Sequence, residues 1–298
     1  MMFSMRRRVL EDYTVKKYVI CYFDILGYKQ MLDKLGDDKY IHYIVCVIDT
    51  LKALLDGEVI VPFNYHIFSD NIIIFVPIQK DDFNNTVVIS EFVRCISILQ
   101  RNLMGQYSIF IRGCITLGNL YYDGKFVYGS GLVKAYNLEN EKAIYPRIIL
   151  DEECVRLCCD NNEILWGFIF NWYVREDVDG CYFLNYLCDL RMIGMNNSKK
   201  DENSIQIDAI NTSEFIELPD PFCNIDFSGN KEIEQLFDKY FTECSSIGLN
   251  YLLLHKVIVE RNIAVAKSEK IKKKYIWCKI YHNEVCKAND IPELIINQ

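Results

Sequence analysis

The chain has 298 residues, 51% of them hydrophobic, so it is long enough to bury a sizeable core in one large domain or in a domain with an appended module. Its 25% content of charged residues is ordinary for a folded protein and excludes wholesale disorder. Lysine and arginine number 33 against 41 aspartates and glutamates, which gives a formal net charge of −8. A protein that binds nucleic-acid backbones normally has a basic surface, so we expect no nucleic-acid partner.

The apolar pattern predicts neither a secretory signal nor a membrane span. The basic cluster at residues 6–8 is not followed by the apolar stretch of a signal peptide. The apolar runs, such as residues 72–77, are too short to cross a bilayer. We therefore expect a cytoplasmic protein that contacts no membrane and keeps its 13 cysteines reduced.

Two groups of possible metal ligands have helical spacing. Cys154 lies four residues before Cys158, and Cys278 lies four residues before His282. A zinc site needs four ligands, and each group offers only part of that set. We interpret these side chains as small residues of the core.

The first part of the chain predicts a strand, two helices and a hairpin. Residues 16–24 form an apolar run that ends on an acid and turns into a helix at residues 25–28. A second helix is predicted over residues 40–55. Residues 59–75 hold two apolar runs broken by residues 69–71, whose Ser-Asp-Asn composition favours a hairpin turn.

The next part predicts a helix, a strand, a helix and a strand. An amphipathic helix is indicated by apolar residues at helical spacing: Val88, Phe92, Cys95 and Leu99. Residues 107–117 read as a strand, residues 129–141 as a helix and residues 147–150 as a short strand. The order β-α-β-β-α-β is that of the ferredoxin-like or palm arrangement. We therefore predict an α+β fold with an antiparallel-containing sheet and helices on one face.

The pattern is weaker after Asp151. Residues 168–173 and 181–187 are predicted as strands around the turn pair Asp179-Gly180. From residue 231 the pattern is helical almost to Asn289, with a break at Gly248. The predicted division is an N-terminal segment (1–14), a catalytic domain (15–190), an irregular connection (191–229) and a helical C-terminal region (230–298).

Asp24 and Asp70 are the first candidate functional residues. Each is a carboxylate beside an apolar run, where it is costly unless something neutralises it. If their strands are neighbours, the two carboxylates meet and favour a hard divalent cation such as Mg²⁺ or Mn²⁺. Gly27 then opens a helix whose free N–H groups suit a triphosphate. In the alternative interpretation, Asp24 caps the helix and Asp70 is a turn residue.

Four segments together resemble the catalytic domain of class III nucleotidyl (adenylate/guanylate) cyclases. They occur in the family's order within residues 15–155: Phe23-Asp24-Ile25-Leu26-Gly27-Tyr28, Phe68-Ser69-Asp70-Asn71, Arg112-Gly113-Cys114-Ile115-Thr116-Leu117-Gly118 and the helical segment Tyr128-Gly129-Ser130-Gly131-Leu132-Val133-Lys134-Ala135-Tyr136-Asn137-Leu138-Glu139. Their character is most similar to bacterial pyrimidine nucleotide cyclases of anti-phage (Pycsar-type) defence.

This resemblance implies a lyase that makes a 3′,5′-cyclic nucleotide and pyrophosphate from a nucleoside triphosphate. Asp24, Asp70 and the backbone carbonyl of Ile25 would hold two Mn²⁺ or Mg²⁺ ions per active site. One ion would activate the ribose 3′-hydroxyl and the other would bind the triphosphate. Gly27, Tyr28 and Arg112 are candidate substrate-binding residues. The family works as a homodimer with shared active sites, and the effector that reads the product is not contacted directly.

The helix segment departs from the family pattern at two positions. The ribose-orienting asparagine falls on Val133, and the transition-state arginine falls on Asn137, which has no charge. A cation on the transferring phosphate is worth several powers of ten in rate. Lys134 or Arg147 is the candidate replacement. A solvated helix face is the alternative interpretation of Lys134.

The positions that select the base are also altered. His66 stands four residues before Asp70, where adenylate cyclases have lysine, and Phe126 stands three residues before Gly129 in place of an aspartate. These residues argue against ATP and favour UTP or CTP, giving cyclic UMP or cyclic CMP. His66 as an ordinary half-buried strand residue is the alternative.

The remaining feature is a basic run near the end of the chain, composed of Lys267, Lys270, Lys272, Lys273 and Lys274. A solvated helix face is the favoured interpretation, and an RNA or partner contact is the alternative.

Two rival functions stay open. The chain could be a nucleotide-binding or regulatory module that has lost the catalytic cation, or a palm-type synthase of short oligonucleotides.

Overall fold

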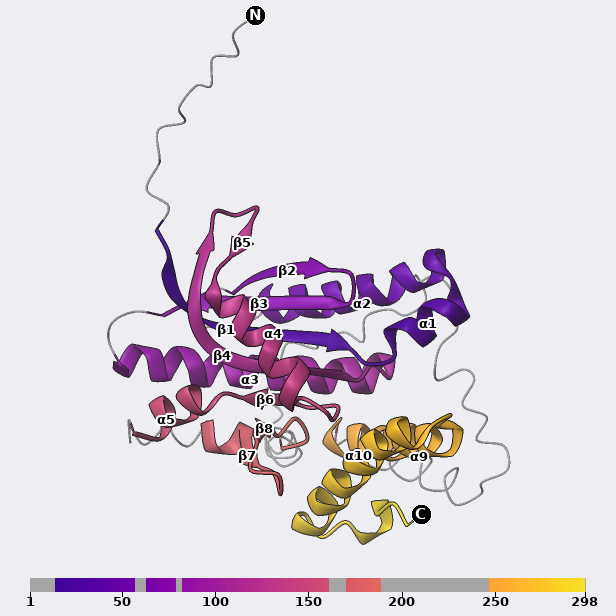
Figure 1. Ribbon diagram of the computed structural model, residues 1–298. Coiled ribbons are helices and arrows are strands. Elements are labelled where there is room, and N and C mark those ends of the chain that lie inside the picture. Colours follow the sequence, from indigo (N-terminus) through magenta and orange to yellow (C-terminus); the bar gives the residue numbers. More distant parts are fainter. Residues whose placement is uncertain (1–13, 57–62, 79–81, 161–169, 189–246, 298) are drawn as a thin grey trace, which may run out of the picture.

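The computed structural model describes residues 14–56, 63–78, 82–160, 170–188 and 247–297. A mixed sheet runs through its centre in the order β2-β3-β1-β4-β6-β8-β7, with β5 paired to β4 alone (Figure 1). The strands are β1 (Lys16–Ile25), β2 (Asn64–Phe68), β3 (Asn71–Pro77), β4 (Ile111–Tyr122), β5 (Val127–Tyr128), β6 (Ile148–Leu150), β7 (Val174–Glu176) and β8 (Tyr182–Leu184). The helices are α1 (Tyr28–Leu35), α2 (Asp37–Asp56), α3 (Asp82–Tyr107), α4 (Ser130–Lys142), α5 (Glu152–Asp160), α9 (Ile247–Val265) and α10 (Glu269–Ala288), and a 3-10 turn, η2, covers Pro292–Leu294.

The predicted α+β fold class is confirmed. β1, β2, β3 and β4 form an antiparallel sheet in which β1 is central, with β3 and β4 on its two sides. Helices α1 and α2 connect β1 to β2, and α3 connects β3 to β4. This is the βαββαβ order and strand arrangement of a ferredoxin-like palm.

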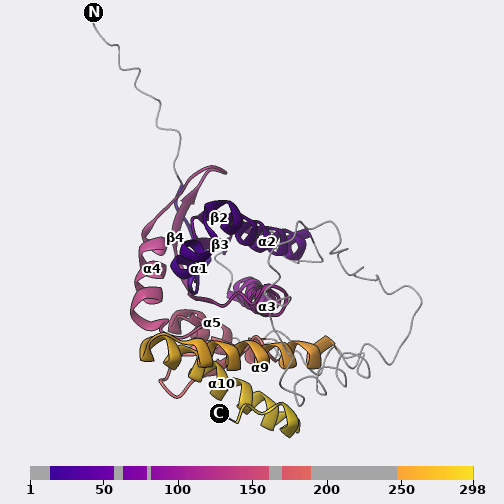
Figure 2. The ribbon, with the colours of Figure 1, turned by 90° about the vertical axis from the view of Figure 1, so that its right-hand side faces the viewer.

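Helices cover both faces of the sheet, which corrects the expectation of helices on one face only. Figure 2 shows α4 on one side of the sheet and α2 and α3 on the other. The residues of β1 explain this, because alternate side chains enter two different cores. Val19, Cys21 and Phe23 pack with α2, α3 and α5, whereas Tyr18 and Ile20 pack with α4, α9 and α10. A strand buried on both faces reads as a continuous apolar run.

α4 lies unusually close to the sheet because two glycines face each other. A Cβ added to Gly118 on β4 would lie 2.4 Å from the Cα of Gly131 on α4. A Cβ on Gly131 would in turn lie 2.5 Å from the Cδ1 of Ile20 on β1. Side chains at either glycine would push α4 away from the strands. This contact fixes the start of the helix that carries Val133, Lys134 and Asn137.

Three predicted elements differ from the observed ones. β4 begins later than residue 107 and runs on to Tyr122, because Tyr107 is still helical and Ser108 turns the chain with a φ of 55°. Residues 170–173, predicted within a strand, are helical, and the strand β7 follows them. Gly248 lies in the first turn of α9 and causes no break.

The C-terminal helices α9 and α10 pack against the sheet through the core that also holds α4. The predicted irregular connection at residues 191–229 lies outside the described residues, and the division into domains stays a prediction.

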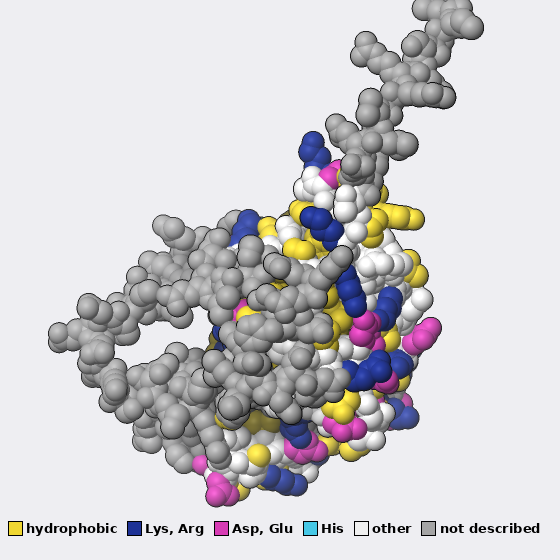
Figure 3. Space-filling view, turned by 90° about the vertical axis from the view of Figure 1, so that its left-hand side faces the viewer, with side chains coloured by type: hydrophobic (Ala, Val, Ile, Leu, Met, Phe, Trp, Pro, Cys, Tyr) yellow, Lys and Arg dark blue, Asp and Glu magenta, His cyan; other side chains and the backbone are white. Residues whose placement is uncertain are grey.

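Among the described helices, none is long and apolar enough to span a membrane. On the side of the molecule in Figure 3, basic and acidic side chains are interspersed over the described surface instead of forming a basic stripe.

Candidate functional site

Asp24 and Asp70 meet at one end of the central strands. Asp24 lies near the end of β1, where its Cα is paired with Asn71 on β3 and with Arg112 on β4. Asp70 lies in the tight turn between β2 and β3, directly before Asn71. The backbone N–H of Ile25 donates a hydrogen bond of 3.3 Å to the carbonyl of Asp70. The end of β1 and the β2–β3 turn therefore bring both carboxylates to the same end of the central strands.

Local turn chemistry fixes this end of the strands. After β1 the chain turns at Gly27, whose φ of 83° is left-handed and favours glycine, and α1 starts at Tyr28. The hairpin turn places Ser69 at a φ of 60°, and its hydroxyl donates to the Tyr28 hydroxyl at 3.0 Å. Gly27 caps α1 without a side-chain hydrogen bond, so Asp24 does not cap this helix. Asp70 is a turn residue and also lies beside a second carboxylate.

Arg112 forms a forked ion pair with Asp24. Its Nε lies 3.0 Å from Oδ1 and its Nη2 lies 2.8 Å from Oδ2 of the carboxylate. The same Nη2 lies 2.8 Å from Oε1 of Glu139 on α4, although the geometry there is not that of a hydrogen bond. Burial by itself lowers the pKa of Arg112, but the hydrogen bonds and charge of Asp24 outweigh it and raise this pKa. Arg112 stays charged and links the strand carboxylate to the helix carboxylate.

The carboxylates are partly desolvated and act on one another. Burial raises the pKa of Asp70, a backbone hydrogen bond opposes the rise, and the charge of Asp24 adds to it. Burial, followed by the charge of Asp24, raises the pKa of Glu139 to about 6. The charge of Arg112 therefore acts on three acids, Asp24, Asp70 and Glu139. Together they carry more negative charge than Arg112 balances, and a bound cation would reduce this excess.

The residues fit a hard divalent cation of the kind that the family resemblance implies. Among the described residues, no group of three or more His, Cys, Asp or Glu side chains converges as a metal cage. Mg²⁺, however, is usually held by one or two carboxylates together with substrate phosphates and water. Asp24 and Asp70 supply such a pair, with Arg112 already balancing one of them. The site thus suits a cation that arrives with a polyphosphate.

A lysine from the C-terminal region also belongs to this site. Lys274 on α10 is half-buried, and its charge acts on Asp24, Arg112 and Glu139. Burial and then the charge of Arg112 lower the pKa of Lys274, while Asp24 and Glu139 oppose that change. The sequence placed Glu139 in the helix motif without a role of its own, and Lys274 in the basic run interpreted as a solvated helix face or, alternatively, an RNA or partner contact. Only the fold brings the two residues close enough to Asp24 to interact with it.

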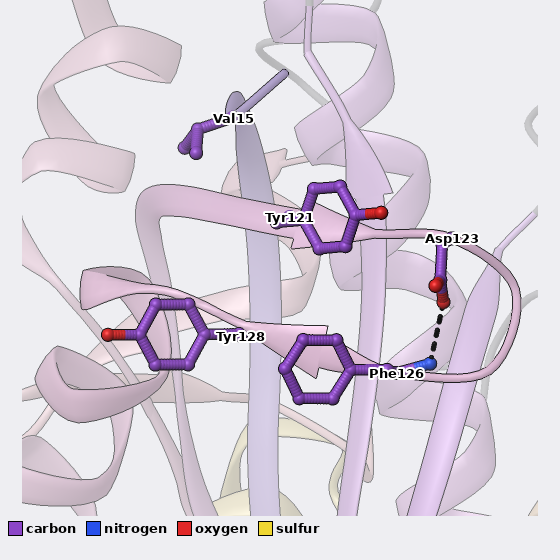
Figure 4. Close-up of a pocket in the computed structure, with 5 residues that line it drawn as sticks. All are labelled: Val15, Tyr121, Asp123, Phe126 and Tyr128. Carbon is purple, nitrogen blue, oxygen red and sulfur yellow. Dashed lines mark hydrogen bonds between the residues drawn. The ribbon is translucent and has the colours of Figure 1, made fainter. Parts of the chain in front are cut away.

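The two residues predicted to select the base lie on different parts of the sheet. His66 is exposed on β2, the edge strand of the sheet, opposite Ile73. Phe126 is exposed in the projecting β4–β5 hairpin, where its ring is stacked on Tyr128 at 6.2 Å between centroids. Figure 4 shows the shallow cavity of this hairpin, which is lined by Val15, Tyr121, Asp123, Phe126 and Tyr128.

Phe126 and Asp24 are at opposite ends of the same pair of strands. Asp24 is paired with Arg112, whereas Lys16 is paired with Leu120, next to the hairpin. Asp24 follows Lys16 by eight positions on β1, a span of roughly 26 Å at the usual rise per residue. One chain therefore cannot bring Phe126 and Asp24 to the same nucleotide.

The α4 residues of the motif face outward. Val133 and Asn137 are exposed, whereas Ala135 and Glu139 face the sheet. Lys134 forms ion pairs with Asp151 and with Glu153, the latter at 3.2 Å, and donates to the Leu117 carbonyl at 3.3 Å. Within one chain its charge is already matched, so its predicted catalytic role stays a prediction.

Arg147 is fully buried. Its guanidinium forms ion pairs with Asp177 and Asp179, in and beside the turn between β7 and β8. The same group lies 5.5 Å from the centroid of the Trp277 ring. These contacts join β6 to the β7–β8 hairpin and to α10. The surroundings of Arg147 are those of a structural ion pair, and its predicted role in substrate binding stays a prediction.

No protein-family model matches the sequence, and no curated protein matches it. Solved structures with some similarity include a bacterial light-regulated adenylyl cyclase, at 11% identity and a TM-score of 0.41, over 59% of this chain and 54% of that one. Another is the guanylate cyclase domain of RhGC from Catenaria anguillulae in complex with GTP, at 12% identity and a TM-score of 0.39, over 57% and 97%.

A third similar structure is a class III adenylyl cyclase-like ATP-binding protein from Pseudomonas aeruginosa, at 11% identity and a TM-score of 0.36. This likeness covers 48% of the present chain and 35% of that chain, so the present chain spans about a third of its length. The function proposed below stands on the residues of the Asp24–Asp70 site and their geometry.

Proposed function

We propose that the chain is a class III-type nucleotidyl cyclase. The observation that carries this proposal is the meeting of Asp24 and Asp70 beside the Gly27 turn, at the edge of a βαββαβ sheet. In the proposed reaction, the ribose 3′-oxygen attacks the α-phosphorus of a nucleoside triphosphate. The bond between that phosphorus and the bridging oxygen of the β-phosphate breaks, pyrophosphate leaves, and the hydroxyl proton passes to solvent.

Each residue of the site has a part in the proposed reaction. Asp24, Asp70 and the carbonyl of Ile25 would hold two Mn²⁺ or Mg²⁺ ions, which activate the 3′-hydroxyl and neutralise the triphosphate when bound. The turn at Gly27 and Tyr28 would position the phosphates at the start of α1. Arg112 would orient Asp24 through its forked pair.

A homodimer with shared sites forms part of the proposal. The separation of Phe126 from Asp24 along the sheet, and the outward-facing Val133 and Asn137 on α4, are consistent with a second copy completing each site. His66 and Phe126 would select a pyrimidine, so UTP or CTP would be the substrate and cyclic UMP or cyclic CMP the product. Signalling in bacterial anti-phage defence is the proposed setting.

A product assay tests the proposal. The purified protein is incubated separately with UTP, CTP, ATP and GTP in the presence of Mn²⁺, and the products are identified by mass spectrometry. The proposal predicts a 3′,5′-cyclic monophosphate from UTP or CTP. Linked nucleotides would instead indicate a palm-type oligonucleotide synthase, and cyclic AMP or cyclic GMP alone would overturn the base selection.

Two observations favour a second candidate, a nucleotide-binding module without turnover. Arg112 already occupies both oxygens of Asp24, and Asn137 provides no charge where the family has arginine. Such a module would bind a triphosphate together with a metal and leave it intact. Binding of UTP or CTP by calorimetry without any cyclic product in the assay above would support this candidate.

A further inference from the structure

The C-terminal helices lie outside the βαββαβ core, yet one of them is packed against the site. Tyr275 on α10 contacts Phe110 edge to face, with ring centroids 5.7 Å apart. Phe110 directly precedes β4, and its carbonyl accepts a hydrogen bond of 2.8 Å from the backbone N–H of Leu26. This contact anchors the first half of α10 next to the strand ends that carry Asp24 and Arg112.

Lys274 is the residue that this anchor presents to the site. It lies one position before Tyr275, it is half-buried, and its charge acts on Asp24, Arg112 and Glu139. It forms no hydrogen bond or ion pair with another described residue. An ammonium group held in partly desolvated surroundings, without a partner of its own, can bind an anionic ligand at little further desolvation cost.

Two further cations act on Lys274. Lys270 lies four residues before Lys274 on the same helix face, and its charge also acts on Lys274. Arg112, already paired with Asp24, also acts on Lys274. Like charges at this spacing repel each other, so a polyphosphate between them would relieve the repulsion. Lys274 thus lies close enough to the carboxylates to interact with them, as a site for a metal-bound polyphosphate requires.

We propose that Lys274 binds the phosphate groups of the nucleotide at the Asp24–Asp70 site and supplies the positive charge that Asn137 lacks. This inference rests on the proposed function. The ammonium group of lysine binds phosphate oxygens as a compact charge, and each such charged hydrogen bond adds substantially to affinity. In this account the C-terminal helical region is part of the site, and its basic run includes a ligand-binding residue.

Binding of inorganic tripolyphosphate in the presence of Mn²⁺, measured by calorimetry, tests the inference independently of base and turnover. Lys274→Met keeps the aliphatic stem and removes the charge, Lys274→Arg keeps the charge, and Lys273→Met is the matched control because Lys273 is exposed on the same helix. We expect Lys274→Met to weaken binding about tenfold to a hundredfold, as for loss of a charged hydrogen bond. The dissociation constant for tripolyphosphate should stay within about threefold of the unchanged protein's value in Lys274→Arg, and within about twofold in Lys273→Met.

The outcomes separate this inference from the proposed function. Tripolyphosphate binding that is equally tight with Lys274→Met, or absent from the unchanged protein, overturns the inference. Binding that depends on Lys274 in a protein that forms no cyclic product supports the inference and contradicts the proposed cyclase activity. Circular dichroism of each variant identifies loss of fold, and retained binding by Lys274→Arg then shows that charge is the property required.

Discussion

Arg112 on β4 holds Asp24 on β1 through two parallel contacts, Nε to Oδ1 at 3.0 Å and Nη2 to Oδ2 at 2.8 Å. The side chains of both residues are about four-fifths buried, with 23% and 19% of their surface exposed. The pair therefore neutralises one carboxylate of the site in the absence of any ligand. Its removal would leave Asp24 and Glu139 without the arginine that lies against both of them.

Replacing Arg112 should make the fold depend on a cation. We expect Arg112→Ala to lower the free energy of unfolding by about 2–4 kcal/mol, because it leaves partly buried carboxylates unpaired. Mn²⁺ should restore more stability to this variant than to the unchanged protein. Thermal unfolding with and without Mn²⁺ measures both effects. Arg175→Ala, which removes a more exposed ion pair with Glu284, is the control, and an equal Mn²⁺ effect in all three proteins would contradict the prediction.

The close approach of α4 to the sheet predicts a steric effect at Gly118. Gly118→Ala places a Cβ against the backbone of Gly131, which can be relieved only by moving α4. We expect a loss of about 1–3 kcal/mol in the free energy of unfolding, as for other overpacked sites. Denaturation in urea measures it. Asn119→Ala changes an exposed neighbour and should be nearly neutral; similar losses for both substitutions would disprove the steric explanation.

A buried chain of hydrogen bonds joins the C-terminal helices. Tyr186 Oη lies 2.9 Å from His255 Nε2, His255 Nδ1 lies 3.1 Å from His282 Nδ1, and His282 Nε2 lies 2.8 Å from the Leu294 carbonyl. Because a carbonyl only accepts, His282 donates from Nε2 and accepts at Nδ1, His255 donates from Nδ1, and Tyr186 donates to His255. In this arrangement both rings are neutral, and their burial disfavours a second proton on either ring.

This chain predicts a loss of stability in mild acid. Burial lowers the pKa of His282 from 6.5 to about 4, and burial and His282 lower that of His255 in the same direction. A group with a lowered pKa in the folded state binds fewer protons than in the unfolded state, so its contribution is present above pH 6.5 and is lost as the pH falls towards 4. The expected loss from His282 between pH 7 and pH 5 is about 2 kcal/mol.

Urea denaturation at pH 7 and pH 5 measures this difference. His282→Gln removes the titrating ring, so the pH dependence should decrease by about the same 2 kcal/mol relative to the unchanged protein. His66→Gln, which changes an exposed histidine of an edge strand, is the control. An unchanged pH dependence in His282→Gln would contradict the assignment of a neutral buried ring.

The elements predicted best have long runs of regularly spaced apolar residues, with turn residues at their ends. The run ending at Asp24, the break at residues 69–71 and the spacing of Phe92, Cys95 and Leu99 all correspond to observed elements. Residues 170–173 were predicted wrongly because a short apolar run suits a strand and a buried helical turn equally. The start of β4 was misplaced because Tyr107 is apolar whether it ends a helix or starts a strand.

The meeting of Asp24 and Asp70 could be predicted because both end apolar runs of a βαββαβ order. The partners of these acids could not be. Arg112 lies 88 residues from Asp24 in the sequence. Lys274 follows a long segment whose sequence pattern does not predict where the C-terminal helices pack. Long-range charge pairs depend on the packing of whole elements, which residue spacing does not specify. The same limit applies to Arg147, whose two aspartate partners lie 30 and 32 residues away.

The most direct test of the central claim is the yield of cyclic nucleotide from Asp70→Asn, measured by mass spectrometry with UTP or CTP and Mn²⁺. Asp33→Asn, an exposed change of the same kind on α1, is the control, and thermal unfolding confirms that both variants fold. If Asp24 and Asp70 form the reaction site, the unchanged protein and Asp33→Asn make the cyclic product. Asp70→Asn then forms it at a rate lower by a factor of about a hundred or more. Undiminished product from folded Asp70→Asn would contradict the account.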